Sequence, residues 1–373
     1  MPATHPTVCI DCSPLLVRSA GVKTYYYHWL EALLARSPDT IRTFLAPGEL
    51  NQLLHPGGLR MYPRQISTLL ALNWLPAFFT RMAAPRCDVF HISNLLHRSP
   101  GGSRLSATLH DLTPWILPEC HTPRMVAADK AFAARVLARA AGIIAVSENT
   151  KRYAVRILNL DPRKIHVIYP GVSDRYFGVT EQASKSAAAF FDLRKPYFLS
   201  VGTIEPRKNL DRLLTAWESL PDSFRHHYDL AIAGMPGWRS AATAERIRQA
   251  SQGGRVRYLG YVPESVMPGL TARATALVYP SLYEGFGLPV AQAMAAGCPV
   301  IASATSSLPE ITGGAALLVA PLSAGDIANA ILQIADSVDL RAKLRAEGLA
   351  QAARFTWDYA AASSLRYFAQ IAG

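Results

Sequence analysis

Short runs of apolar residues alternate along the chain with longer stretches in which apolar positions recur with helical spacing. The short runs have the length and composition of buried strands in a parallel sheet. In the first half of the chain they occupy residues 8–11, 88–92, 105–109, 142–146 and 165–168. Segments such as 22–35 and 125–140 lie between them and carry helical periodicity, so the pattern predicts βα units.

The alternation is interrupted at about residues 173–195, where glycines and a Ser/Ala-rich stretch show no clear strand. A second series of apolar runs then occupies residues 197–201, 228–233, 256–259, 276–279 and 299–302. Because 373 residues exceed the usual size of one domain, we predict an α/β protein with two tandem, doubly wound, Rossmann-like domains, 1–172 and 196–355, joined by a linker at 173–195. Ligands bind at the carboxyl ends of such sheets, so we expect the active site in a cleft between the domains.

Composition narrows the class of protein. The 38 Lys and Arg residues against 27 Asp and Glu give a net charge of +11, which favours polyanions, anionic lipid or diphosphate substrates. We find no nucleic-acid-binding motif and expect no nucleic-acid partner. The five scattered cysteines, with no leader pattern before them, predict a reducing cytoplasm, and Cys9 and Cys12 are interpreted as buried strand residues and not as a metal site.

The longest apolar stretch, residues 66–79, is too short to span a bilayer and contains Pro76. Arginines flank it, and with Trp74, Phe78 and Phe79 they would suit a helix lying in a membrane interface. We favour the alternative, a buried helix of the first domain. A peripheral location on the inner face of the membrane stays open.

The segment SLYEGFGLPVAQAMAAG, residues 281–297, follows a predicted strand and contains Pro289 where a helix is expected to start. A turn at Gly285, Phe286 and Gly287 would present backbone N–H groups at the helix N-terminus, which suits a diphosphate or carboxylate. Glu284 would lie at the strand end. A strand–glycine–helix unit is also common as plain structure, so the segment alone does not decide between the two readings.

A second segment, VGTIEPRKNL at residues 201–210, also runs from a strand through a turn toward a helix. Arg207 and Lys208 place two cations at the ligand-binding end of the sheet. Fixed cations can neutralise a departing nucleoside diphosphate without a metal ion. The alternative is a solvated basic turn.

Together the two segments resemble the donor site of glycosyltransferase family 4, retaining enzymes of the GT-B fold, and specifically its mannosyltransferase-like branch. Further similarities cover nearly the whole chain: VIYPGVSDRYF at 167–177, HDLTP at 110–114, and FTWDYAAASSLRYF, which is similar to the family's terminal helix. The resemblance implies that residues 356–373 form a helix that packs back toward the first domain.

The resemblance implies a role for each matching position. Arg207 and Lys208 would hold the diphosphate, Glu284 would meet the transferred sugar, and His110 would lie beside sugar and phosphate. The full set of implied donor-binding positions is Gly21, Thr203, Arg207, Lys208, Glu284, Gly285, Phe286, Gly287, Leu288 and Gln292. Gln292 stands where the family has a second glutamate for the ribose hydroxyls, and Gly21 stands alone in a loop where the family often has paired glycines.

The implied reaction needs no cofactor, no metal and no protein nucleophile, because the leaving phosphate oxygen itself takes the acceptor's proton. The expected partners are a GDP- or UDP-sugar donor, with GDP-mannose as the guess, and a glycan or lipid-linked acceptor in polysaccharide or glycolipid synthesis. A sugar-nucleotide epimerase and a phosphorylase are alternatives with related folds. Gln292 also leaves room for a non-catalytic subunit that binds a nucleotide sugar.

Overall fold

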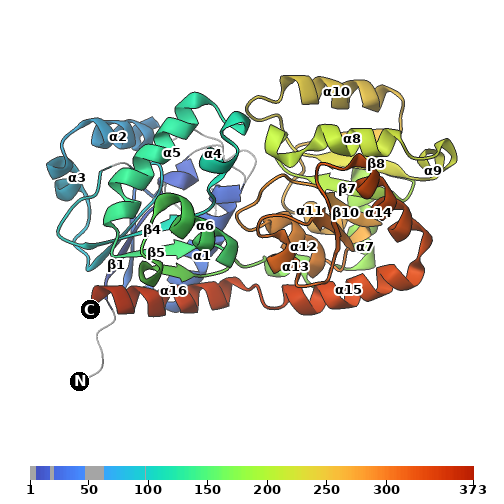
Figure 1. Cartoon of the computed structure of the whole chain (residues 1–373). Coiled ribbons are helices and arrows are strands. Elements are labelled where there is room, and N and C mark those ends of the chain that lie inside the picture. The colour runs from blue at the N-terminus through green and yellow to red at the C-terminus, as the bar shows by residue number, and fades with distance from the viewer. Residues whose placement is uncertain (1–5, 17–20, 47–62, 97) are drawn as a thin grey trace. The chain divides into compact units, whose positions relative to one another are not determined.

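The computed structural model describes residues 6–16, 21–46, 63–96 and 98–373, and its chain divides into two compact units (Figure 1). The first comprises residues 1–115, 123–171 and 356–373, and the second comprises residues 116–122 and 172–355. Each unit holds a six-stranded parallel sheet. The predicted α/β class with two sheets is therefore confirmed.

The first sheet has the strand order β2-β1-β3-β4-β5-β6. Its strands are β1 (Val8–Asp11), β2 (Ile41–Phe44), β3 (Val89–Ile92), β4 (Arg104–Leu109), β5 (Gly142–Ala145) and β6 (Ile165–Val167). The helices of this unit include α1 (Gly21–Arg36), α2 (Pro63–Trp74), α3 (Ala77–Ala83), α5 (Pro123–Arg135), α6 (Glu148–Leu158) and α16 (Trp357–Ala372), and the short α4 (Thr113–Ile116) ends at the unit boundary.

All five strands predicted in this half are present, and among the described residues only the edge strand β2 was missed. The first and last residues of β2 are buried, whereas its two middle residues are exposed and half-buried, so the strand has no continuous apolar run. By contrast, β1, β3 and β5 are buried at every position, which is why their sequence pattern is clear. Cys9 is buried on β1 as predicted, and Cys12 is buried one residue beyond the end of this strand.

The C-terminal helix α16 packs against α1 within the first unit. Trp29 on α1 donates its indole N–H to Ser364 Oγ at 2.9 Å, and Arg36 forms a two-pronged ion pair with Asp358 at 2.7 and 2.6 Å. On the sheet, a Cβ added to Gly142 would lie 2.6 Å from the Tyr367 hydroxyl. Close contact with α16 therefore explains the glycine at the start of β5.

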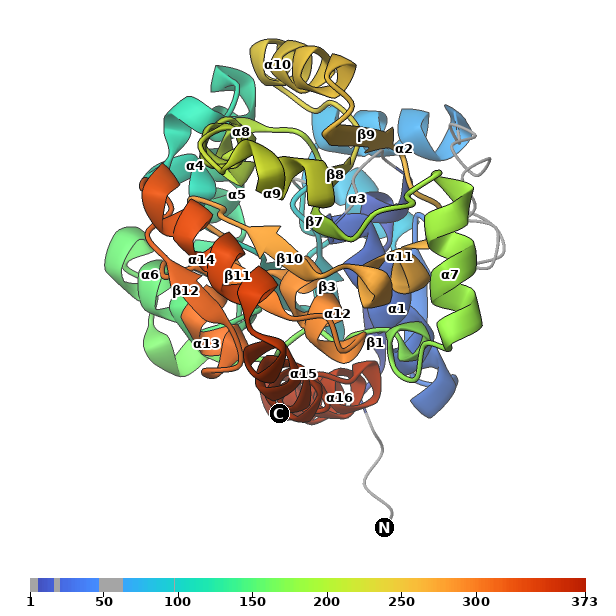
Figure 2. The same cartoon turned by 90° about the vertical axis from the view of Figure 1, so that its right-hand side faces the viewer.

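The second sheet has the order β12-β11-β10-β7-β8-β9 and helices on both faces (Figure 2). Its strands are β7 (Tyr197–Val201), β8 (Asp229–Ala233), β9 (Val256–Gly260), β10 (Ala276–Tyr279), β11 (Val300–Ser303) and β12 (Leu317–Val319). Its helices are α7 (Glu181–Phe190), α8 (Leu210–Glu218), α9 (Asp222–His227), α10 (Ala241–Gln252), α11 (Met267–Arg273), α12 (Leu288–Ala295), α13 (Leu308–Thr312), α14 (Ala324–Asp336) and α15 (Val338–Ala352). The five predicted strands are present, and the three-residue edge strand β12 was missed.

Residues 173–195, expected to be a linker, instead contain helix α7, which packs against α11 inside the second unit. The helix starts where Thr180 Oγ1 accepts a hydrogen bond from the Ala183 N–H at 3.2 Å. Small side chains let the two helices approach closely, since a Cβ on Gly269 would lie 2.7 Å from the Ala183 carbonyl oxygen. The Ser/Ala-rich composition that suggested a linker thus serves helix packing.

Helices α2 and α3 occupy the long apolar stretch, and the expectation that it is buried is wrong for most of its large side chains. Leu69 and Leu72 are buried, whereas Leu70, Trp74, Phe78 and Phe79 are exposed. Pro76 separates the two helices, so the apolar positions do not follow one continuous helical face. Among the described residues, no helix is both long and apolar enough to cross a membrane.

Candidate functional site

The two segments singled out from the sequence meet at one point of the second sheet. Strand β7 is the first of this sheet in sequence, and its neighbours β8 and β10 continue the chain in opposite directions across the sheet. Crevices at such a reversal of strand order are where doubly wound sheets bind ligands. The loop after β7 carries Arg207 and Lys208, and the loop after β10 carries Glu284. Parallel pairing of β7 and β10 brings both loops to the same edge.

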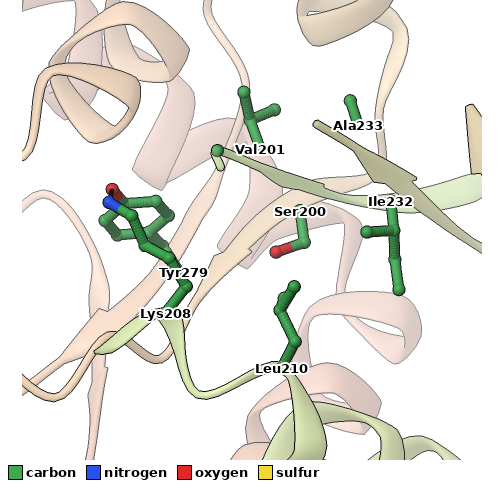
Figure 3. A pocket seen from close by; sticks show the side chains of 8 residues that line it. Ser200, Val201, Lys208, Leu210, Ile232, Ala233 and Tyr279 are labelled. Atoms are coloured by element: carbon green, nitrogen blue, oxygen red, sulfur yellow. Dashed lines mark hydrogen bonds between the residues drawn. The ribbon is translucent and has the colours of Figure 1, made fainter. Parts of the chain in front are cut away.

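Arg207 and Lys208 are held by fixed partners. Arg207 contacts the Glu205 carboxylate at 2.6 Å and the Glu284 carboxylate at 2.7 Å, and it donates to the Tyr283 carbonyl at 2.8 Å. Lys208 Nζ contacts Glu284 at 2.7 Å and the Tyr279 hydroxyl at 2.6 Å (Figure 3). The two cationic side chains are only 13% and 12% exposed, which excludes the solvated basic turn.

Glu284 links the two cations. Burial would raise the pKa of this carboxyl, but Arg207 and Lys208 outweigh it and hold the pKa at about 2. Ser281 adds a hydrogen bond from its hydroxyl at 2.6 Å. Burial lowers the pKa of Lys208, and the neighbouring Arg207 lowers it further, against the opposing effect of Glu284. Glu284 is therefore a fixed carboxylate at neutral pH.

Glu205 is the acidic partner that the sequence analysis missed. Its side chain is 2% exposed, and Oε1 pairs with Arg207, while the buried Oε2 has no hydrogen-bond partner within the described part of the chain. Burial raises its pKa, opposed chiefly by Arg207. When Glu205 is ionised as well as Glu284, the two cations are balanced by two carboxylates before any ligand arrives. Its position two residues before Arg207 was the feature of the sequence that could have indicated this pairing.

Helix α12 follows the glycine-containing turn. Gly287 caps its N-terminus in the left-handed region, with φ at 96°, and a Cβ there would lie 2.5 Å from Leu308 Cδ2. Leu288 is the first helical residue, so Pro289 lies one position later than predicted. Gln292 is half-buried on the same helix. The turn is also supported from the next loop, where Ser306 Oγ accepts the Glu284 N–H at 3.0 Å.

A small pocket beside Lys208 extends between the ends of β7 and β8 (Figure 3). Ser200, Leu210, Ile232 and Tyr279 are among its lining residues. Gly202 also lines this pocket, and a Cβ on it would lie 3.3 Å from Lys208 Cε. A Cβ on Gly234 would lie 1.8 Å from the Gly202 carbonyl oxygen, so the loops after β7 and β8 approach closely. Half-buried Thr203 follows Gly202 in this loop.

His110 follows β4 in the first unit. Its ring packs edge-on against Tyr25, with centroids 4.9 Å apart, and its buried Nε2 has no hydrogen-bond partner among the described residues. Burial lowers the pKa of His110 to about 4, so the ring is neutral at physiological pH. Asp111 accepts hydrogen bonds from the Thr113 N–H at 3.0 Å and hydroxyl at 2.6 Å, which orients this loop.

The structure thus brings together Arg207, Lys208, Glu284 and the turn at 285–288, all in the second unit. His110 and Gly21 belong to the first unit, and Gly21 is the first residue of α1. Of the loop before it, Ser19 and Ala20 lie outside the described residues. Within the described part of the chain, no group of three or more His, Cys, Asp or Glu side chains is placed to hold a metal ion.

Two family profiles match the chain. Residues 19–176 match the family described as Glycosyltransferase Family 4, and residues 181–351 match Glycosyl transferases group 1. Together they span both units.

Individual relatives agree with these matches. The chain is 35% identical over 256 residues to the O-antigen chain mannosyltransferase B of Escherichia coli, covering 68% of this chain and 67% of that protein. It is 27% identical over 240 residues to the serotype-specific mannosyltransferase WbdA of the same organism, covering 62% of this chain but only 29% of WbdA. Among solved structures, Alr3699/HepE from Anabaena in complex with UDP-glucose superposes with a TM-score of 0.73 at 16% identity, over 97% of this chain and all of that one.

Proposed function

This chain belongs to the group 1 glycosyltransferases, with an N-terminal half of glycosyltransferase family 4 and the GT-B fold, and from that premise we propose that it is a retaining, metal-independent hexosyltransferase. The donor is a nucleoside-diphosphate sugar, with GDP-mannose as the first choice. The acceptor is a glycan or a lipid-linked glycan. The mannosyltransferases among its relatives support mannose, and the UDP-glucose complex of HepE supports a nucleotide-sugar donor.

The observation that carries this proposal is the cluster of Arg207, Lys208 and Glu284 where strand order reverses in the second sheet. Arg207 and Lys208 would meet the diphosphate, and Glu284 would meet the sugar while keeping both cations in place. Preorganised charges of this kind stabilise the charge that develops on a leaving group, at no cost of rearrangement during the reaction.

In the proposed reaction, the bond from sugar C1 to the phosphate oxygen breaks, and a bond from C1 to the acceptor oxygen forms on the same face. The acceptor's proton passes to the oxygen of the departing diphosphate. No bond to the protein is made, so the reaction does not need the two carboxylates of a glycosidase. The chain's own contribution is charge stabilisation by Arg207 and Lys208, and orientation through Glu284.

The direct test measures nucleotide release from GDP-mannose and from UDP-glucose, with and without mannose-terminated oligosaccharide acceptors. Acceptor-dependent release of GDP, with an axial linkage in the product by NMR, would support the proposal. Conversion of the nucleotide sugar without an acceptor would indicate an epimerase, and activity only with added phosphate would indicate a phosphorylase. Donor binding without turnover would indicate the non-catalytic subunit that Gln292 leaves open.

Activity should be unchanged in excess chelator. A loss of activity that magnesium or manganese restores would contradict metal independence.

A further inference from the structure

Helices α2 and α3 expose an unusual concentration of large apolar side chains, which we call the α2–α3 surface. Its members are Leu70, Trp74, Leu75, Phe78, Phe79 and Met82. Trp74 is 89% and Phe78 63% exposed. Elsewhere in the described chain, large exposed apolar side chains are spread over several elements, such as Phe190 on α7 and Met235 after β8. Contiguous exposed apolar patches usually mark a binding surface.

The same segment has a one-sided charge. From residue 50 to residue 87 the sequence contains no Asp or Glu, but it contains Arg60, Arg64, Arg81 and Arg86. Of these, Arg64, Arg81 and Arg86 lie in the described part of the chain and are exposed. The apolar side chains are therefore flanked by cations that no acid in this segment neutralises.

The combination of exposed apolar side chains and flanking arginines indicates which partner binds the α2–α3 surface. A second copy of the chain would bring two cationic surfaces together, which like-charge repulsion opposes. An anionic bilayer offers acyl chains for the apolar side chains, phosphates for the arginines and an interfacial zone in which Trp is favoured. Helix α2 has 12 residues and α3 has 7, so they are far too short to span a bilayer and suit a position in its surface.

We propose that the α2–α3 surface docks the protein onto anionic phospholipid bilayers. The partner is the bilayer itself, with Trp74 and Phe78 inserting among acyl chains and Arg81 and Arg86 contacting phosphate groups. The inference deepens the proposed function, because it places the enzyme at a surface where a lipid-linked acceptor is found. The inference rests on the exposed apolar side chains and the arginines of the α2–α3 surface, and it uses no residue of the proposed donor site.

The test is co-sedimentation of the full chain with phosphatidylcholine vesicles, with and without phosphatidylglycerol. We expect binding that requires phosphatidylglycerol and weakens in high salt. Trp74→Ala with Phe78→Ala should lower the partition coefficient more than tenfold, because each side chain loses the apolar burial that insertion would supply. Phe190→Ala is the matched control, since Phe190 is 65% exposed on a helix of the other unit, and it should bind as wild type.

Arginine variants separate charge from insertion. Arg81→Gln and Arg86→Gln should each weaken binding to phosphatidylglycerol vesicles about fivefold, the equivalent of roughly 1 kcal/mol per cation near an anionic surface. Arg194→Gln, which removes an arginine whose side chain is 86% exposed in the other unit, should leave binding unchanged. Thermal unfolding of each variant should match wild type, because every substituted side chain is exposed.

Three outcomes would overturn the proposal: equal binding to both vesicle types, binding unaffected by the Trp74 and Phe78 substitutions, or vesicle-free self-association that those substitutions abolish. The last would identify the surface as a contact between copies. Nucleotide release with a water-soluble acceptor, measured on the same variants, should stay at the wild-type rate. Failure of donor turnover with normal vesicle binding would contradict the proposed function alone.

Discussion

The two sheets share a doubly wound topology, yet their ligand-binding ends differ in charge. In the second unit, the reversal of strand order between β7 and β10 carries Arg207 and Lys208, bound to Glu205 and Glu284. In the first unit the reversal lies between β1 and β3, where buried Asp11 accepts hydrogen bonds from the backbone and hydroxyl groups of Ser13 and Ser93. In the first unit, neutral donors hold the buried carboxylate at the reversal. In the second unit, cations hold the carboxylates there.

From this difference we propose that the second unit binds the nucleotide sugar and the first unit binds the acceptor. A nucleoside diphosphate is negatively charged, so cations that are already positioned can form strong, charge-assisted hydrogen bonds with it. A sugar acceptor is a set of neutral hydroxyl groups, and uncharged hydrogen-bonding groups suit such a partner. The same fold thus supports two kinds of ligand, and side chains in a few loops account for the difference.

The largest effect should come from removing a cation of the second unit. Arg207→Ala and Lys208→Ala should each lower turnover about a hundredfold, roughly 2.7 kcal/mol, the scale of one lost preorganised electrostatic group. The double variant should be almost inactive. Initial rates at saturating and limiting donor would separate binding from the chemical step.

Arg212→Ala provides the control, because Arg212 is exposed on α8, one turn beyond the 3-10 segment that carries Arg207 and Lys208. Arg207→Ala removes the ion-pair partner of buried Glu205, whereas Lys208→Ala leaves Glu284 paired with Arg207. The unfolding of both variants must therefore be compared with wild type. Near-normal turnover in both folded single variants would contradict the assignment of these cations to the diphosphate.

His110 should matter next, and without any charge change of its own. Loss of one hydrogen bond to a charged phosphate costs about 2 kcal/mol, so His110→Ala should lower turnover roughly thirtyfold. Burial holds the pKa of His110 at about 4, so the ring is already deprotonated at pH 6. The ratio of wild-type to variant turnover should therefore stay constant from about pH 6 to about pH 8. A ratio that falls as pH rises across this range would show that the protonated ring acts. His226→Ala, at an exposed histidine of the second unit, should be neutral.

The sequence predicted the fold through its buried strands and missed what lies at edges and surfaces. Strands β2 and β12 are partly exposed and short, so no apolar run marks them. The apolar run at 66–79 predicted a helix correctly, but hydrophobicity alone could not tell that Trp74 points to solvent while Leu72 points inward. Periodicity was broken by Pro76, which removed the usual guide to the buried face.

The candidate site shows the same limit in another form. Position after a strand located Arg207, Lys208 and Glu284, because every parallel strand delivers its loop to the same edge. Pairing could not be obtained this way: the contact between Lys208 and Tyr279 joins residues 71 positions apart. Glu205 resembled an ordinary turn residue, and only its burial against Arg207 reveals a partner of the cations.

Glu205 gives a third prediction, with the opposite sign for binding. Its carboxylate competes with a diphosphate for Arg207, so Glu205→Gln should tighten donor binding roughly tenfold, the equivalent of about 1.4 kcal/mol of removed charge repulsion. Burial raises the pKa of Glu205, so the advantage of the variant should shrink as pH falls and the wild-type carboxyl is protonated, at a higher pH than for an ordinary glutamate. Calorimetric titration with GDP-mannose at several pH values measures both the change in affinity and its pH dependence.

Glu218→Gln is the control, since that carboxylate pairs with Arg246 at 2.7 Å but is half exposed. Weaker donor binding by a folded Glu205→Gln variant would show that Glu205 mainly positions Arg207.

The smallest effect should come from Gln292, the departure from the family pattern in the proposed donor site. If its half-buried side chain on α12 faces the ribose, Gln292→Glu supplies a charged acceptor, and charged hydrogen bonds are worth about 1 kcal/mol more than neutral ones. Donor binding should then tighten about fivefold. A carboxylate close to the diphosphate would instead be repelled, so weaker binding would place the side chain nearer the phosphates than the ribose. Titration with both the intact donor and the free nucleoside separates these cases, because only the donor carries the diphosphate. Gln333→Glu on α14, away from the loops after β7 and β10, controls for added charge. Identical affinities of wild type and Gln292→Glu for both ligands would remove position 292 from the ribose site.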